Sequence, residues 1–255
     1  MHFSHAKLMD PLTAAAASGL QARMDSLDLL ANNLSNTSAN GYKADREFYS
    51  TYLAAEAIDS PDPAVGDSPV VERQWTDFAQ GPLVNTASST DLALAGPGFF
   101  AVNGPSGTLY TRNGSFQVSP NGLLTSSEGY PVQLVGGQTL TLTPGTPLMV
   151  GADGSVSQNG AALGQLQVVN FADPNQLQKA AAANFQNPDP RRIIAQAATN
   201  VQVAQGKLEG SNASPTESAA RMVVLLRNFE MLQKAVKIGA DMNRQAVEEV
   251  AKVGS

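Results

Sequence analysis

The chain contains no cysteine and only two histidines, His2 and His5, among its 255 residues. The absence of cysteine excludes disulfides, thiol nucleophiles, and zinc or iron–sulfur centres held by thiolates. Both histidines lie at the extreme N-terminus, where chain ends are commonly poorly ordered. Two ligands on such a tail make no closed metal site, and a tail histidine is a poor catalytic base. We therefore expect no metal site and no histidine-based catalysis.

Charge is also scarce, since Asp, Glu, Lys and Arg make up 15% of the chain against about 25% in typical globular proteins. The net charge is −6, and the pair Arg191-Arg192 is too short for a basic patch. We therefore expect no nucleic-acid partner. No apolar run reaches the roughly 18 residues of a membrane span, so we expect no integral membrane segment. Asp10-Pro11 interrupts the start of the Ala-rich stretch, which argues against a cleaved signal peptide.

One glycine motif superficially suggests a cofactor. Gly96-Pro-Gly98-Phe-Phe-Ala101 fits the dinucleotide pattern G-x-G-x-x-A. That site requires a helix after the turn, whereas Phe99 to Val102 is a strand pattern. The sequence therefore predicts a tight turn before a buried strand and no cofactor.

Helical patterns occupy the two ends of the chain. Asp10-Pro11 and the capping box Ser214-Pro-Thr-Glu217 predict helix starts. Apolar residues then recur at alternating spacings of about three and four, which is typical of a coiled-coil seam. The seam residues, which we predict as the assembly interface, are Leu20, Met24, Leu27, Leu34, Met222, Leu225, Phe229, Leu232 and Val236. The seams fit either a hairpin within one chain or contacts between copies, and the greater length of the second favours contacts between copies.

The middle of the chain has short alternating runs separated by glycine turns. Leu92–Leu94, Gly98–Val102, Thr108–Arg112, Ser115–Ser119, Thr139–Thr143 and Gln165–Phe171 read as strands. Asn113-Gly114 predicts a hairpin, and Asn121-Gly122, Asp153-Gly154 and Asn159-Gly160 predict further turns. The sequence therefore predicts an α+β fold: a discontinuous coiled-coil module of the two terminal helices plus a mainly antiparallel β-domain. Its parts would be a disordered leader (1–8), an N-terminal helix (9–43), a linker (44–80), the β-domain (81–210) and a C-terminal helix (211–255).

Several motifs together resemble a known family. Ala31-Asn-Asn-Leu-Ser-Asn-Thr-Ser-Ala-Asn-Gly-Tyr-Lys43, Asp91-Leu-Ala-Leu-Ala-Gly-Pro-Gly-Phe-Phe100, Tyr110-Thr-Arg-Asn-Gly114, Asn121–Val132 and Leu208-Glu-Gly-Ser-Asn212 are similar to signatures of flagellar rod and hook proteins. The signature positions are Asn32, Asn33, Leu34, Asn36, Gly41, Tyr42, Lys43, Asp91, Gly98, Phe99, Phe100, Tyr110, Arg112, Gly129, Leu208, Glu209, Ser211, Asn212 and Glu230.

The resemblance implies a structural, non-enzymatic subunit of the basal-body rod, in the bacterial periplasm. It implies that terminal helices pack with copies of the chain in a helical tube and that the rod transmits motor torque. It also implies contacts with other rod and hook proteins, and export by the flagellar export apparatus without a cleaved signal peptide. The fairly short linker, in which Trp75-Thr-Asp-Phe-Ala-Gln-Gly-Pro-Leu83 leads straight into the β-domain, resembles that of a proximal more than that of a distal rod protein. The residues before Met9 depart from the family pattern.

Two other functional classes stay open at this level. A glycan-acting enzyme with a β-domain needs paired carboxylates, and Asp91 and Glu128 are the only plausible pair. The third possibility is a monomeric binding module. A concentration-dependent filament would distinguish the rod subunit from that module.

Overall fold

A computed structural model describes residues 11–53, 67–181 and 183–253. The leader predicted at 1–8 lies outside these residues. The chain divides into two compact units, which we describe separately. The first unit contains 11–34, 45–75 and the chain from Pro215, and the second contains 35–44 and 76–214.

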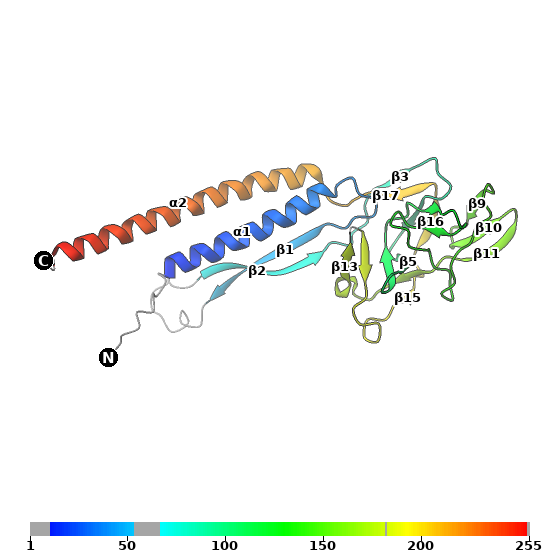
Figure 1. The fold of residues 1–255 in the computed structure, drawn as a ribbon, viewed down its shortest axis with the longest axis horizontal. Helices are drawn as coiled ribbons and strands as arrows, with labels where there is room; N and C mark the ends of the chain where they lie inside the picture. Colours follow the sequence, from blue (N-terminus) through cyan, green and yellow to red (C-terminus); the bar gives the residue numbers. More distant parts are fainter. Residues whose placement is uncertain (1–10, 54–66, 182, 254–255) are drawn as a thin grey trace. The chain divides into compact units, whose positions relative to one another are not determined.

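The first unit combines two long helices with a β-hairpin (Figure 1). Helix α1 spans Pro11–Ser35 and helix α2 spans Pro215–Val253, so each begins at the proline that the sequence places at a first helical position. Strands β1 (Asp45–Leu53) and β2 (Asp67–Thr76) pair with each other. These strands lie within the segment 44–80 that we expected as a linker.

The predicted coiled-coil module of the two terminal helices is wrong, although an α+β class is partly consistent with the structure. The buried positions of α1 include Ala22, Ser26, Leu30 and Asn33, whereas Met24 of the predicted seam is 50% exposed. The reason is the hairpin: the Asn33 side chain accepts a hydrogen bond from the Asp45 N–H (3.0 Å) and donates one to its carbonyl (2.8 Å). Because a face of α1 serves the hairpin, the two helices do not form a seam by themselves.

The second unit is a set of small antiparallel sheets. Its largest sheet has six strands in the order β13-β14-β6-β5-β12-β15, beside a three-stranded sheet β11-β10-β9 and the pairs β16-β4, β17-β3 and β7-β8. The bounds are β3 Leu83–Asn85, β4 Leu92–Ala95, β5 Phe99–Gly104, β6 Gly107–Thr111, β7 Gln117–Val118, β8 Leu124–Thr125, β9 Leu148–Val150, β10 Ser155–Gln158, β11 Ala161–Gln165, β12 Val168–Asn170, β13 Gln178–Ala181, β14 Asn184–Gln186, β15 Gln196–Ala197, β16 Gln202–Gln205 and β17 Lys207–Glu209, with a short 3-10 helix η2 at Pro174–Gln176.

Strand β5 lies between two hydrophobic cores. Phe100 and Val102 contribute to a core with Leu92, Phe116 and neighbouring leucines, while Phe99 and Ala101 contribute to an aromatic core. Successive side chains of a strand point to opposite faces, so a strand buried on both faces is apolar throughout. The apolar run at 98–102 is explained by this double burial.

Two predictions about local strand pairing are wrong. The Asn113-Gly114 hairpin does not form, since β6 pairs with β5 and β14 while β7 pairs with β8. Gly114 instead accepts a hydrogen bond from the Leu92 N–H, and a Cβ there would lie 1.6 Å from the Leu92 carbonyl oxygen. Thr139–Thr143 makes only isolated bridges at Thr139 and Thr141. The turns at Asp153-Gly154 and Asn159-Gly160 do form, joining β9 to β10 and β10 to β11.

Candidate functional site

Three distant segments of the sequence meet in a buried group of charges inside the second unit. Lys43 follows α1, Arg112 follows β6, and Glu209 ends β17. Side-chain exposure is 0% for Lys43, 5% for Arg112 and 0% for Glu209. We call these three residues the ion network.

Glu209 is the centre of the ion network. Its Oε1 accepts hydrogen bonds from Lys43 Nζ (2.6 Å) and from the Gly81 N–H (2.9 Å), while its Oε2 accepts one from Arg112 Nη1 (3.1 Å). Lys43 Nζ also donates to the Ala79 carbonyl (2.7 Å), and Arg112 Nη2 donates to the Gly96 carbonyl (2.8 Å). Charged groups buried in this way are stable only when paired and hydrogen-bonded. These contacts pair all three charges, although the buried Arg112 Nε–H has no hydrogen-bond partner among the described residues.

Backbone contacts join the same segments. The Gly41 N–H donates to the Glu209 carbonyl at 2.7 Å. Gly41 has φ +69°, and a Cβ there would lie 2.3 Å from the Asn113 nitrogen, so only glycine fits. The segment after α1 therefore lies directly against the end of β17 and the residues after β6.

Asn212 links the two sides of this site. Its Oδ1 accepts from the Ala44 N–H (2.7 Å), and its Nδ2 donates to the carbonyls of Asp77 (2.7 Å) and Ala79 (3.1 Å). One amide side chain thus connects the segment after α1, the segment after β2 and the segment before α2.

A second lysine approaches from β13. Lys179 Nζ donates to the Lys43 carbonyl (2.7 Å) and lies 4.5 Å from the centre of the Tyr42 ring. Such a cation above an aromatic face adds a favourable contact. Arg112 likewise lies 5.5 Å from the centre of the Phe99 ring. The rings of Tyr42 and Phe99 therefore lie beside the ion network.

The electrostatics favour a structural role. Burial lowers the pKa of Lys43, and the nearby Glu209 carboxylate opposes that change. Burial also lowers the pKa of Arg112, again opposed by Glu209. Both oxygens of the single carboxylate already accept hydrogen bonds from protein donors. The arrangement connects chain segments, and it presents no group placed for proton transfer to a ligand.

The structure brings only part of the predicted signature into this site. Gly41, Tyr42, Lys43, Arg112, Glu209 and Asn212 meet there, and Ser211 accepts a hydrogen bond from the Ala213 N–H beside it. Phe99 borders the site through its contact with Arg112. The remaining signature residues lie elsewhere: Asn32 and Asn33 in α1, Leu34 near its end, Asn36 in the turn after it, Asp91 bridged to Ser115, Gly98, Phe100, Tyr110 and Leu208 in or beside strands, Gly129 in a turn, and Glu230 exposed on α2.

Several residues of the site were not predicted. Asp77, Ala79, Gly81 and Gly96 contribute backbone groups, and Lys179 contributes its ammonium group. Backbone donors and acceptors have no signature in the sequence. The burial of Lys43, which would have required an acidic partner, cannot be inferred from the sequence.

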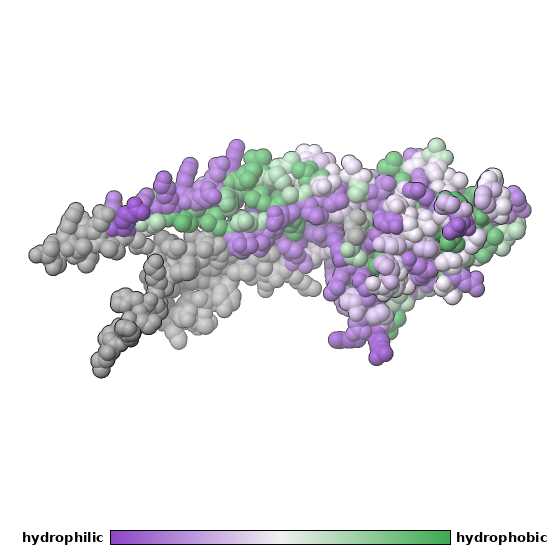
Figure 2. All heavy atoms as spheres, viewed as in Figure 1, coloured by the Kyte–Doolittle hydropathy of each residue, from purple (hydrophilic) through white to green (hydrophobic). Residues whose placement is uncertain are grey.

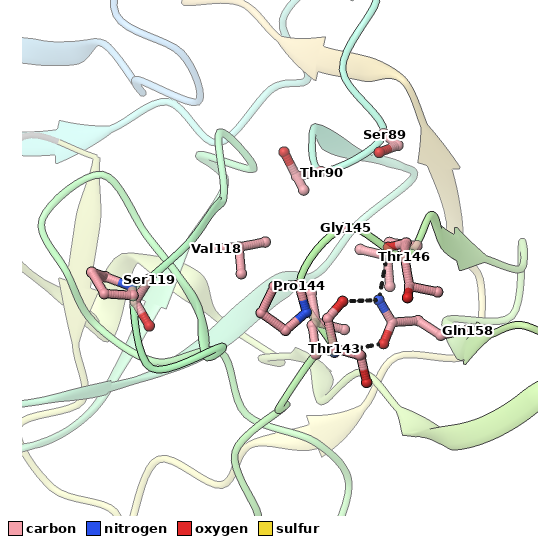
Figure 3. A pocket seen from close by; sticks show the side chains of 12 residues that line it. Ser89, Thr90, Val118, Ser119, Thr143, Pro144, Gly145, Thr146 and Gln158 are labelled. Carbon is pink, nitrogen blue, oxygen red and sulfur yellow. Dashed lines mark hydrogen bonds between the residues drawn. The ribbon is translucent and has the colours of Figure 1, made fainter.

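A separate pocket of about 420 Å³ lies between three segments of the second unit (Figure 3). Its lining contains Ser89 and Thr90, Val118 to Pro120, and parts of 142–158, with no Asp, Glu or His. Asp91 and Glu128, the carboxylates considered for an enzyme, do not line it. Among the described residues no group of His, Cys, Asp or Glu is arranged to hold a metal ion.

Comparison with known proteins identifies the family. A profile described as the flagellar hook protein FlgE/F/G D1 domain matches residues 93–158, and one described as the flagellar basal body rod FlgEFG protein C-terminal region matches 204–249. The flagellar basal-body rod protein FlgF of Caulobacter vibrioides is 33% identical, over 89% of this chain and 92% of its own length. The chain belongs to the FlgE/F/G family of flagellar rod and hook proteins.

Other members of the FlgE/F/G family agree. FlgF of Salmonella typhimurium is 29% identical over 89% of this chain and 93% of its own length. FlgG of Buchnera aphidicola subsp. Schizaphis graminum is 30% identical over 92% of this chain and 97% of its own length. These relatives support a structural subunit of the flagellar basal-body rod, as the resemblance implied, with FlgF a better match than FlgG. Among the described helices of this family member, none has the length and hydrophobicity of a membrane span.

Proposed function

We propose that this FlgF-like chain assembles with copies of itself and with neighbouring rod and hook proteins into a tube that transmits motor torque. The observation that carries the proposal is the exposed apolar surface of α2. Val224, Met231, Ile238 and Met242 are 57–63% exposed. Figure 2 shows hydrophobic residues gathered over the beginning of α2, with more hydrophilic residues toward its grey end. A monomer gains nothing from exposing these side chains to water, whereas an assembly buries them.

A groove in the first unit provides a place for a neighbouring helix. It has a volume of about 360 Å³ and lies between α1, β1 and α2. Leu30, Val224 and Leu225 form its apolar part, and Arg23, Arg221 and Glu47 are its charged residues. The predicted interface residues Met222, Phe229, Leu232 and Val236 are half-buried in the isolated chain, while Leu225 is buried. Burying a large apolar side chain contributes about 1.5–3 kcal/mol.

We expect Phe229→Asp to stop rod assembly and swimming, because a carboxylate at a helix–helix contact loses its hydration without gaining a partner. Motility in soft agar and electron microscopy of isolated basal bodies measure the effect. The matched control is Gln233→Asp, which adds the same charge at an exposed position of α2. Normal swimming of the Phe229→Asp strain, with the protein present in its basal bodies, would contradict the proposed interface.

The proposal also covers where the chain lies in the cell and how it is exported. The chain would lie in the periplasmic part of the basal body and reach it through the flagellar export apparatus without loss of a cleaved signal peptide. Family membership supports this route. Intact-mass measurement of the protein from basal bodies tests it, since cleavage would remove residues from the N-terminus.

We also propose that the chain has no catalytic activity. The absence of carboxylates and histidine from the lining of the 420 Å³ pocket supports this. Hydrolysis of cell-wall glycan by the purified protein, abolished by Asp91→Asn, would contradict it.

A further inference from the structure

Five asparagines of the sequence are each followed directly by a glycine. They are Asn40, Asn103, Asn113, Asn121 and Asn159. Asparagine is a thermally labile residue, and a glycine after it is the most reactive neighbour, because no side chain hinders the glycine nitrogen from attacking the carboxamide. Whether such a pair reacts in a folded protein depends on whether the glycine nitrogen is free to reach that carboxamide.

Hydrogen bonds hold the glycine nitrogen in two of the five pairs. The Gly41 N–H donates to the Glu209 carbonyl (2.7 Å), and the Gly122 N–H donates to the Ser119 carbonyl (2.8 Å). Neither nitrogen can attack until its hydrogen bond breaks. Gly122 is also closely packed, since a Cβ there would lie 2.7 Å from the Leu142 carbonyl oxygen.

Side-chain contacts and strand pairing hold two further pairs. Asn113 Oδ1 accepts a hydrogen bond from the Ser115 N–H (3.1 Å), and the glycine that follows Asn113 is buried. Asn103 belongs to strand β5, and Gln133 Nε2 donates to its Oδ1. Rotating the backbone at either place would disrupt packed or paired structure.

The pair Asn159-Gly160 lacks these restraints. It forms the two-residue turn between β10 and β11, and both residues are exposed. Within the described part of the chain, nothing beyond the adjacent residues lies within 4 Å of the place that a Cβ would take on Gly160, and no hydrogen bond involves its N–H or the Asn159 carboxamide. Asn159 has φ +49°, which is uncommon for a residue with a side chain. Local opening of this turn therefore costs less free energy than opening at the other four pairs.

We propose that Asn159 is the residue at which the folded chain deamidates. The Gly160 nitrogen attacks the side-chain carbonyl carbon of Asn159 and forms a C–N bond, while the bond from that carbon to the amide nitrogen breaks. The amide nitrogen leaves as ammonia and takes the proton of the Gly160 N–H, so that a cyclic succinimide remains. Water then opens the ring at either of its carbonyls, which gives aspartate or isoaspartate.

Both products change the hairpin of β10 and β11. Each adds a negative charge to a three-stranded sheet whose strands contain no charged residue. Isoaspartate also lengthens the backbone within a turn whose length sets the register of the two strands. The reaction is a property of the folded chain itself, so the inference does not rest on the proposed function.

Incubation of the purified full-length chain at mildly alkaline pH tests the proposal, with one sample folded and a second in denaturant. Peptides from successive times are analysed by mass spectrometry, which detects the replacement of NH2 by OH at each asparagine. Asn121 is the matched control within the chain. It is exposed like Asn159, and its glycine has φ +78° against +79° for Gly160, but the N–H of that glycine is hydrogen-bonded.

In the folded chain we expect Asn159 to react about tenfold faster than Asn121, which corresponds to a difference of about 1.4 kcal/mol in the free energy of opening. The other three asparagines should be as slow as Asn121. In denaturant the five rates should become similar, because no fold then restrains the glycine nitrogens. Asn159→Gln should remove the main acidic species that ion-exchange chromatography detects after incubation of the folded chain, since glutamine forms the corresponding ring far more slowly.

Three results would overturn the proposal. The first is an equal or faster reaction at another of the five asparagines in the folded chain. The second is an unchanged Asn159 in the folded chain after the denatured chain has reacted. The third is the same preference for Asn159 in denaturant, because the fold would then not be its cause.

Discussion

At the scale of single residues, the Glu209 carboxylate compensates the buried positive charges of the ion network. Glu209 faces two buried cations, Lys43 and Arg112, whose positions in the sequence are far apart. Removing one member of such a group leaves an uncompensated buried charge, which costs more than the pair itself contributes. The signature residues Lys43, Arg112 and Glu209 are thus explained by one shared contact.

Glu209→Gln should destabilise the second unit by about 3–5 kcal/mol, because Lys43 and Arg112 then remain buried without an anion. Chemical unfolding followed by circular dichroism measures this loss. Adding Lys43→Met to Glu209→Gln should restore part of the stability, since one unpaired cation is removed. The control Glu128→Gln, at an exposed carboxylate outside the ion network, should leave unfolding unchanged. Equal stability of Glu209→Gln and the parent chain would show that the ion network has no structural role.

At the scale of elements, the sequence correctly indicated where helices begin but not which face each one buries. Pro11 and Pro215 are local signals, and they mark the starts of α1 and α2. The packing face depends on a partner, and the hairpin of β1 and β2 was not predicted. The residues buried in α1 include the small residues Ala22 and Ser26. The predicted seam consisted of large apolar residues such as Met24, which is exposed.

Leu30→Ala should therefore cost about 2–5 kcal/mol of first-unit stability, the usual range for truncating a buried leucine. Leu30 is 5% exposed, whereas Met24 is 50% exposed. Met24→Ala is the matched control and should have a much smaller effect. Trp75, the only tryptophan, belongs to the first unit, and its fluorescence during unfolding reports the difference. A larger loss for Met24→Ala would restore the predicted seam as the packing face.

Turn signals had the same limitation. Asn159-Gly160 joins β10 to β11 because those neighbouring strands pair with each other. Asn113-Gly114 has equally strong local chemistry, yet Gly114 lies against Leu92 and no hairpin forms. Local propensity fixes the turn residues, while long-range pairing decides whether the flanking runs become partners. The site residues Lys43 and Glu209, 166 positions apart, illustrate why family resemblance found them and spacing did not.

At the scale of the whole molecule, the chain order and the division into units do not coincide. Residues 35–44 follow the first helix in sequence but belong to the second unit, where they provide Gly41 and Lys43. The second unit is therefore incomplete without a piece of chain that precedes β1. Contacts through Asn212 place the segment after α1 and the segment before α2 against the same β-structure.

A comparison of fragments 36–214 and 45–214 tests this dependence. Both contain all the strands of the second unit, but the shorter one lacks Lys43 and the Gly41 N–H contact to Glu209. We expect the shorter fragment to melt about 10 °C lower, since the loss of a buried ion partner costs several kcal/mol in a domain of this size. In the longer fragment, Lys43→Met should reproduce much of that decrease, because it removes the same cation without shortening the chain. Thermal melts that coincide for the two fragments would mean that 35–44 only rests on the β-structure and contributes nothing to its folding.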